Sequence, residues 1–256
     1  MSTQTSREEA CVQTLAKLAD KQIKFTIPKA LATDFDRNEP EGLFYLFKTL
    51  NDTFFGGVFK RGLNLKLEWA DGEPGTAYET FGLTRARGAV ISKNRRTIMI
   101  TITLNRDLCS VDTCDREGKA LAALIHQMGH AYFLLRCGAK DGTNIHDEHF
   151  KALMVSISDI IYPYESEVAA FLLMSIGKDN KLESGNPEDH CEWHDHPDMR
   201  PVFPRRAILG QEIAGVHKRA EELAEKLIQD QKEEERMKKR ARIKEFFSFT
   251  NRKEDD

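Results

Sequence analysis

Cysteine is scarce in this chain, and no two cysteines have the spacing of a metal or redox pair. The five lie at Cys11, Cys109, Cys114, Cys137 and Cys191, so no C-x-x-C motif occurs. An odd, scattered set favours free thiols in a reducing compartment over a disulfide framework.

Long hydrophobic runs and a strong net charge are also missing. The first twenty residues are polar, so we expect no signal peptide, and no stretch approaches the length of a membrane span. The net charge of −3 argues neither for nor against nucleic acid, because local patches matter more than the sum. With 256 residues, 40% hydrophobic and 31% charged, the chain has a soluble globular composition and allows one sizeable domain with extensions, or two small domains.

Helical and extended patterns follow one another along the chain. Apolar residues at helical spacing predict helices over residues 7–22, 41–54, 115–137, 147–161 and 165–176. Alternation and β-branched residues predict strands over 63–69, 81–92 and 97–104, with a hairpin turn at 93–96. We therefore expect an α+β fold, with helices packed on a small, mostly antiparallel sheet.

Composition divides the chain into four parts. We predict an N-terminal helix and linker over 1–39, a central domain over 40–176, a Pro/His-rich loop over 177–206 and a charged helical tail over 207–256.

Three histidines in and after the 115–137 helix have the pattern of a metal site. His126 and His130 are four residues apart, so a helix places both imidazoles on one face. His146 follows a turn-rich break, and two histidines from one helix with a third from a later element are typical of a zinc site with an open position. The ordinary alternative is a set of hydrogen-bonded core histidines. His149 and Glu148 are alternative third ligands, and Asp141 is a weaker one.

Gln127 stands at the position of a general base. Zinc metalloproteases carry H-E-x-x-H, in which the Glu takes a proton from the metal-bound water, whereas residues 126–130 read HQMGH. An amide can hold a water but cannot accept a proton at neutral pH. The metal site is therefore expected to survive and catalysis to be weakened, by natural loss or by an engineered trap. We expect Tyr132 to be a packed aromatic rather than an oxyanion-binding group.

Four segments, in order, resemble the SprT-like domain, the metalloprotease fold of the DNA–protein crosslink protease Spartan. Residues 42–57, GLFYLFKTLNDTFFGG, resemble the family's LFxxFNxxYFGG helix, and a strand ending at Glu68-Trp69 resembles its vxW strand. Residues 122–133, AALIHQMGHAYF, resemble LLHEMxHAYL, and residues 146–150, HDEHF, stand where the family has HGPxF. Three departures are Gln127, the missing Gly-Pro after His146, and the absence of the cysteine-rich zinc ribbon that some relatives carry.

The resemblance implies a zincin-like fold, a Zn²⁺ cofactor and action on proteins bound or crosslinked to DNA, in the nucleus or alternatively the cytoplasm. Our leading hypothesis is a zinc-binding protease homologue, a pseudoenzyme related to DNA–protein crosslink repair. A second is a non-enzymatic DNA- or chromatin-associated module that holds peptides in the old cleft. A third is an active protease with Asp147 or Glu148 as substitute base.

Basic residues suggest partners in two places. The predicted hairpin carries a cluster that, with Lys60 and Arg61, would contact phosphates, or is simply solvated: Arg85, Arg87, Lys93, Arg95 and Arg96. The tail carries KKRARIK at 238–244, an import signal or phosphate-binding arm.

Ile243, Phe246 and Phe247 have the I-x-x-F-F spacing of a sliding-clamp-binding peptide, although Arg240 replaces its leading Gln, and a helix end with exposed aromatics is the alternative. The segment 190–196, HCEWHDH, is rich in ligand types and is either a second metal site or a polar loop.

Overall fold

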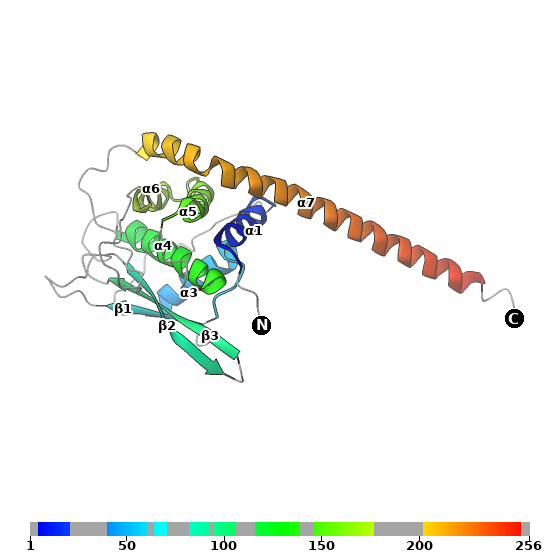
Figure 1. Ribbon diagram of the computed structural model, residues 1–256, viewed down its shortest axis with the longest axis horizontal. Helices are drawn as coiled ribbons and strands as arrows, with labels where there is room; N and C mark the ends of the chain where they lie inside the picture. The colour runs from blue at the N-terminus through cyan, green and yellow to red at the C-terminus, as the bar shows by residue number, and fades with distance from the viewer. Residues whose placement is uncertain are drawn as a thin grey trace.

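The computed structural model describes residues 5–20, 40–60, 64–70, 82–92, 95–105, 116–138, 146–176 and 202–251. It is an α+β fold, as the sequence predicts, with helices collected on a small sheet (Figure 1). The helices are α1 (Arg7–Asp20), α3 (Pro40–Phe54), α4 (Arg116–Cys137), α5 (Glu148–Ile161), α6 (Ser166–Ser175) and α7 (Val202–Asn251). The strands are β1 (Leu65–Ala70), β2 (Gly82–Ser92) and β3 (Arg95–Asn105).

The sheet has the strand order β1-β3-β2. β2 and β3 form the predicted antiparallel hairpin, whereas β1 lies parallel to β3 with Leu65 opposite Ile100. β3 begins at Arg95, so Arg95 and Arg96 belong to the strand rather than to the turn. The β-branched run of residues 97–104 therefore forms the central strand, where its alternate side chains have neighbours on both sides.

Alternation along the strands turns one face of the sheet toward the helices. Ile100, Ile102 and Leu104 of β3 are fully buried, and Leu65 and Leu67 of β1 continue the same apolar surface. α4 packs on β2 and β3 at this face, and α3 contacts β1 (Figure 1). α4 is buried on almost every side, because α1, α5 and α6 cover its other faces.

α1 lies in the same core as α4 and α5. Ala10, Cys11, Leu15 and Leu18 are buried there, and the helix contacts α4, α5 and α7 (Figure 1). The predicted boundary at residue 40 remains a prediction from composition, but the packing of α1 is continuous with that of the central helices.

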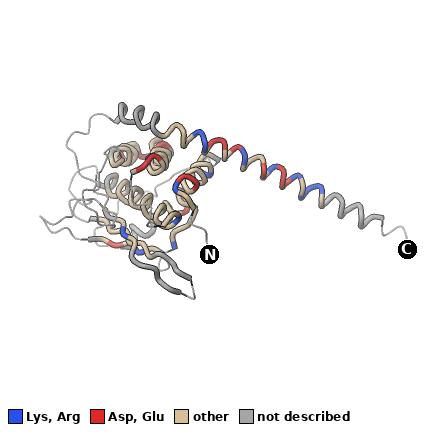
Figure 2. The backbone as a smooth tube through the Cα atoms, in the orientation of Figure 1, with Lys and Arg blue, Asp and Glu red and all other residues tan. Residues whose placement is uncertain are grey.

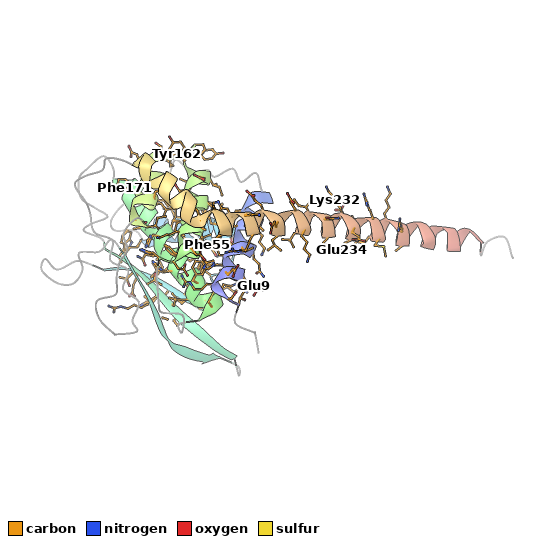
Figure 3. The ribbon with its side chains drawn as sticks, turned by 45° about the horizontal axis from the view of Figure 1, so that its top comes forward. Glu9, Phe55, Tyr162, Phe171, Lys232 and Glu234 are labelled. Carbon is orange, nitrogen blue, oxygen red and sulfur yellow. The ribbon has the colours of Figure 1, made fainter. Side chains whose placement is uncertain are left out.

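α7 is a single helix of 50 residues that packs along its first half only. Ile213, Val216 and Ala220 are buried against the body, and Arg219 Nε lies 2.7 Å from Glu8 Oε1 of α1. Beyond that the helix projects alone, with charges of both signs (Figures 1 and 2). The side chains of Lys232 and Glu234 extend from it into open space (Figure 3). No described helix is long and apolar enough to cross a bilayer.

Candidate metal centre

α4 places the first two histidines of the centre. Its middle turns are rich in Ala and Leu, which are strong helix formers, so the four-residue spacing of His126 and His130 becomes one helical turn. His126 is fully buried and His130 is 7% exposed, which places both imidazoles inside the protein rather than on its surface.

The third histidine lies immediately before α5. Asp147 is the N-cap of that helix: its backbone is extended, and its Oδ1 accepts a hydrogen bond of 2.8 Å from the Phe150 amide. His146 precedes this cap and is 4% exposed. The start of α5 thus presents His146 to the two histidines of α4.

The three imidazoles converge through their Nε2 atoms. His130 Nε2 and His146 Nε2 each lie 3.1 Å from His126 Nε2, and one ligand atom of each histidine falls within 4.8 Å of the others. Nitrogens that share a tetrahedral zinc at about 2.0–2.1 Å are roughly 3.3 Å apart. The observed separations therefore fit a single metal ion bound by all three residues.

Ser175, at the end of α6, fixes the protonation of His126. His126 Nδ1 lies 2.8 Å from Ser175 Oγ, and that hydroxyl donates to the Leu172 carbonyl at 2.7 Å. Because the hydroxyl hydrogen is donated to the carbonyl, Ser175 Oγ acts as the acceptor of a hydrogen bond from His126 Nδ1–H. This leaves the lone pair of Nε2 directed at the other two histidines, which is the tautomer a metal ligand needs.

Phe150 forms a wall beside all three histidines. Its ring stacks on His130 at 4.3 Å and on His146 at 4.9 Å between centroids, and meets His126 edge to face at 5.1 Å. The ring is fully buried. It therefore excludes water from that side and limits the rotation of two ligands.

Burial keeps the histidines of α4 neutral. It lowers the pKa of His126 well below its ordinary value, and the neighbouring His146 lowers it further. The pKa of His130 is lowered by burial and then by His126 and His146. Three close imidazoles cannot all be cations, so at neutral pH these two side chains are in the state that binds a metal.

Gln127 points away from open solvent and into a contact with β2. Its Nε2 donates to the Gly82 carbonyl at 3.0 Å, and its Oε1 accepts from the Thr84 hydroxyl at 2.7 Å. The residue is 1% exposed. A Cβ on Gly82 would lie 2.9 Å from Gln127 Cγ, so the glycine permits this approach. The amide thus ties the metal-binding helix to the sheet with both a donor and an acceptor.

The alternative ligands and bases have other contacts. His149 is not among the converging ligand atoms; its Nδ1 lies 3.6 Å from Asp147 Oδ2. Glu148 is exposed, and its Oε1 lies 3.7 Å from His149 Nε2. Burial raises the pKa of Asp147, but hydrogen bonds from His149 and Arg7 outweigh it and lower that pKa to about 2.

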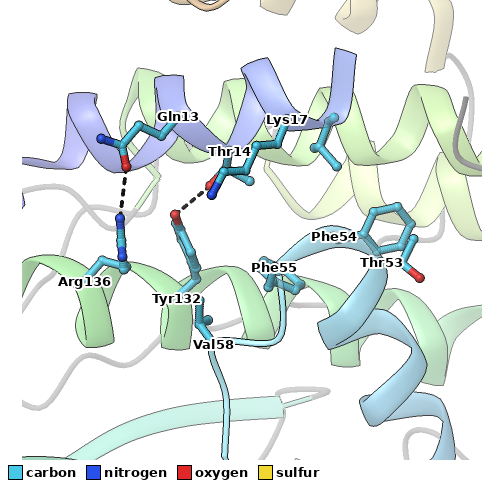
Figure 4. A pocket seen from close by; sticks show the side chains of 11 residues that line it. Gln13, Thr14, Lys17, Thr53, Phe54, Phe55, Val58, Tyr132 and Arg136 are labelled. Carbon is cyan, nitrogen blue, oxygen red and sulfur yellow. Dashed lines mark hydrogen bonds between the residues drawn. The ribbon is translucent and has the colours of Figure 1, made fainter. Parts of the chain in front are cut away.

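Tyr132 faces away from the histidines, toward α1. Its hydroxyl donates to the Ala10 carbonyl at 3.1 Å and lies 2.6 Å from Thr14 Oγ1 beside a cavity of about 70 Å³ (Figure 4). Burial raises the pKa of this hydroxyl. Tyr132 is a packed, hydrogen-bonded aromatic, and Arg136 reaches Gln13 from the same face of α4 (Figure 4).

The other candidates from the sequence lie on different elements or outside the described residues. Arg85 and Arg87 lie on β2, with Arg85 opposite Thr101 and partly buried, and Arg95 and Arg96 lie on β3. The backbone of Ile243, Phe246 and Phe247 continues helix α7. Lys93, Asp141 and the segment 190–196 lie outside the described residues.

Three residues around the centre carry no signal in the sequence. Ser175 and Thr84 are common residue types, and Arg7 lies in a helix assigned to another part of the chain. Only the tertiary arrangement connects these three with the histidine segments. Phe150 differs, because it belongs to the HDEHF segment, although its contacts with all three histidines appear only in the structure.

Comparisons with known proteins assign no family to this chain. A scan against protein-family models and searches of curated proteins and of solved structures found no match. The geometry of the three histidines and the resemblance of the sequence segments are therefore what indicates a function.

Proposed function

We propose that this protein is a zinc-binding homologue of the SprT-like metalloproteases with impaired catalysis. One observation carries the proposal: the Nε2 atoms of the buried histidines His126, His130 and His146 converge within reach of one metal ion. The order of segments resembling SprT-like domains supports this assignment, as does the pairing of a histidine-bearing helix with a third histidine beyond it.

The donor set favours zinc. Three neutral imidazoles suit zinc, copper, iron or nickel, and zinc is the usual occupant of three-histidine centres that keep a fourth position open. A bound zinc would polarise a carbonyl and lower the pKa of a water. The chain itself contributes the three ligands, the Ser175 hydroxyl that orients one of them, and the Phe150 ring that keeps water from one side.

Impaired catalysis follows from the environment of Gln127. Its amide cannot accept a proton at neutral pH. The amide nitrogen is already hydrogen-bonded to the Gly82 carbonyl and the amide oxygen to the Thr84 hydroxyl. Loss of a general base typically costs about 10²–10⁴-fold in rate. Asp147, one of the two candidate substitutes, caps α5 and pairs with Arg7, which argues against its serving as the base.

The engaged amide also favours the second candidate, a module that binds peptides without cutting them. In both cases the proposed partner is a protein segment, on DNA-bound or DNA-crosslinked proteins, in the nucleus or alternatively the cytoplasm. DNA contact through the β2–β3 hairpin and clamp binding through Ile243, Phe246 and Phe247 belong to the same proposal.

A zinc titration monitored by calorimetry tests the metal site. We expect one zinc per chain, and loss of binding in His130→Ala, because the two remaining imidazoles complete neither the donor set nor the geometry. His217→Ala is the matched control: His217 Nε2 lies 3.2 Å from Ser156 Oγ, outside the centre, and its removal should leave zinc binding unchanged. Absence of zinc binding in the parent protein would refute the proposal.

Proteolysis of a DNA-binding protein, with and without single-stranded DNA, tests the catalytic part. The zinc-loaded parent should cut at least about 100-fold more slowly than its Gln127→Glu variant if the cleft is otherwise intact. Equal cleavage by both proteins would show that Gln127 does not limit the reaction. Zinc binding without cleavage by either would favour the peptide-binding module.

A further inference from the structure

Arg7 of α1 holds the residue beside the third histidine. Its Nε donates to Asp147 Oδ2 at 2.6 Å, and its Nη2 donates to Asp147 Oδ1 at 3.2 Å. Both side chains are largely buried, at 18% and 22% exposure, so water competes weakly for this pair. A two-point contact of this kind fixes the direction of the carboxylate as well as its position.

Asp147 connects that contact to the metal centre. The same carboxylate caps α5 through the Phe150 amide, and His146 is its neighbour in the chain. His146 precedes the first residue of α5, whereas His126 and His130 lie within the helix α4. The direction of the adjoining Asp147 side chain and backbone therefore contributes to the place of His146.

α1 makes two further contacts around the same segment. Cys11 Sγ donates to the His149 carbonyl at 3.2 Å, on the other side of Asp147 from His146. The Arg7 guanidinium also lies over the Phe133 ring, 4.4 Å from its centroid, and Phe133 belongs to the helix that carries His126 and His130. Arg7 thus bridges the two elements that supply the ligands.

We infer that Arg7 is a positioning residue for His146 and that α1 is a working part of the metal centre. The inference rests on the proposed metal-binding function, and extends it to a helix about 140 residues away in sequence from the ligand it places. Without the guanidinium, the Asp147 carboxylate loses its hydrogen bonds to α1, and the contact of Arg7 with Phe133 of α4 is lost as well. His146 then samples positions in which its Nε2 is out of reach of the other two.

Zinc affinity of full-length variants tests the inference. Arg7→Met keeps an unbranched side chain at this position but removes the guanidinium with its contacts to Asp147 and Phe133, and we expect zinc affinity to fall by about 10-fold or more, as for other groups that orient a metal ligand. Arg7→Lys keeps the positive charge but lacks the planar, two-point hydrogen-bonding geometry of the guanidinium. Its zinc affinity should therefore lie between those of Arg7→Met and the parent.

Asp147→Asn is the second variant, because an Asn still accepts the Phe150 amide and so keeps the cap. If Arg7 and Asp147 act as one unit, the double variant Arg7→Met/Asp147→Asn should bind zinc no more weakly than the poorer single variant. Additive losses would mean that the two residues act separately, and would overturn the inference.

Arg219→Met provides the matched control, since it removes an ion pair between α1 and α7 that does not reach His146. We expect its zinc affinity to equal that of the parent, with the stability of each metal-free protein measured by urea unfolding. Parent-like zinc affinity in Arg7→Met, or an equal loss in Arg219→Met, would overturn the inference. A parent protein that binds no zinc would overturn the proposed function itself.

Discussion

Ser175 decides which nitrogen of His126 is available to a metal. The hydroxyl oxygen accepts a hydrogen bond from Nδ1–H and the hydroxyl donates one to the Leu172 carbonyl, which favours the tautomer with the proton on Nδ1. Without it, part of the population would carry the proton on Nε2, where it blocks binding.

Ser175→Ala should therefore lower zinc affinity by about 10–100-fold. Ser158→Ala is the control: that buried serine also donates to a backbone carbonyl, of Ala169 at 3.1 Å, but touches no histidine. Both variants should lose a similar, small amount of stability, and calorimetry should detect weaker zinc binding only in Ser175→Ala. Equal zinc affinity in both would remove Ser175 from the centre.

Gln127 illustrates how one position can be read in two ways. The sequence shows only that a Glu is missing from an H-E-x-x-H pattern. The structure adds that the amide donates to the Gly82 carbonyl, a contact that an ionised carboxylate cannot make. Gln127 therefore connects α4 to β2 by hydrogen bonds, in addition to lacking the proton-accepting group of a Glu.

At the scale of elements, close packing of α4 against α5 holds the centre together. A Cβ on Gly129 would lie 2.5 Å from Met154 Cε and 2.9 Å from Phe150 Cε2. The methionine end can move, but the phenylalanine ring is fixed between histidines. The glycine lets α5 approach the helix that carries His126 and His130.

Gly129→Ala should accordingly weaken zinc binding and lower the free energy of unfolding, because overpacking costs about 1–3 kcal/mol against a gain of about 1 kcal/mol in helix propensity. Gly118→Ala in the same helix is the control: its Cβ would meet the Phe171 ring at 3.4 Å, an ordinary contact. Urea unfolding should find Gly118→Ala as stable as the parent or more so. A stabilised Gly129→Ala with full zinc affinity would contradict this account.

The first half of α7 packs on the body of the protein, and its second half projects from it. An ion pair four residues apart, between Glu234 and Lys238, lies on the projecting part, where every described side chain from 232 to 241 is exposed. The helix thus presents the basic residues Lys238, Lys239 and Arg240 to solvent. Its roles in import, phosphate contact or clamp binding remain predictions.

At the scale of the whole molecule, Cys11 reports whether α1 and the centre open together. Burial, with a smaller contribution from the Asp147 carboxylate, raises the pKa of its thiol to about 12. A protonated thiol reacts slowly with alkylating reagents, so labelling requires opening of the core.

A variant that keeps Cys11 as its single cysteine should be labelled slowly at pH 8 and rapidly in urea. Zinc at about 100 times its dissociation constant should slow labelling by about 100-fold, since only the folded state binds it. Alkylation followed by mass spectrometry measures both rates. A Cys11 labelling rate that zinc does not change would mean that α1 opens independently of the metal centre.

Local pattern by itself determined several features of this protein. The α+β class, the helix that carries His126 and His130, and the β2–β3 hairpin each follow from periodicity over a few neighbouring residues. The pairing of the α4 histidines needs only one helical turn. The position of His146 relative to Phe150 favours it over His149 as the third ligand, and the geometry places its Nε2 with the other two.

The tertiary structure alone decided what holds those ligands. Ser175 is 49 residues from His126, and Arg7 is 140 residues from Asp147, so neither contact has a signature in local spacing. The parallel pairing of β1 with β3 and the tie between Gln127 and β2 likewise depend on how the elements pack. Side chains distant in sequence meet only when the core closes, because burial rather than sequence order sets their neighbours.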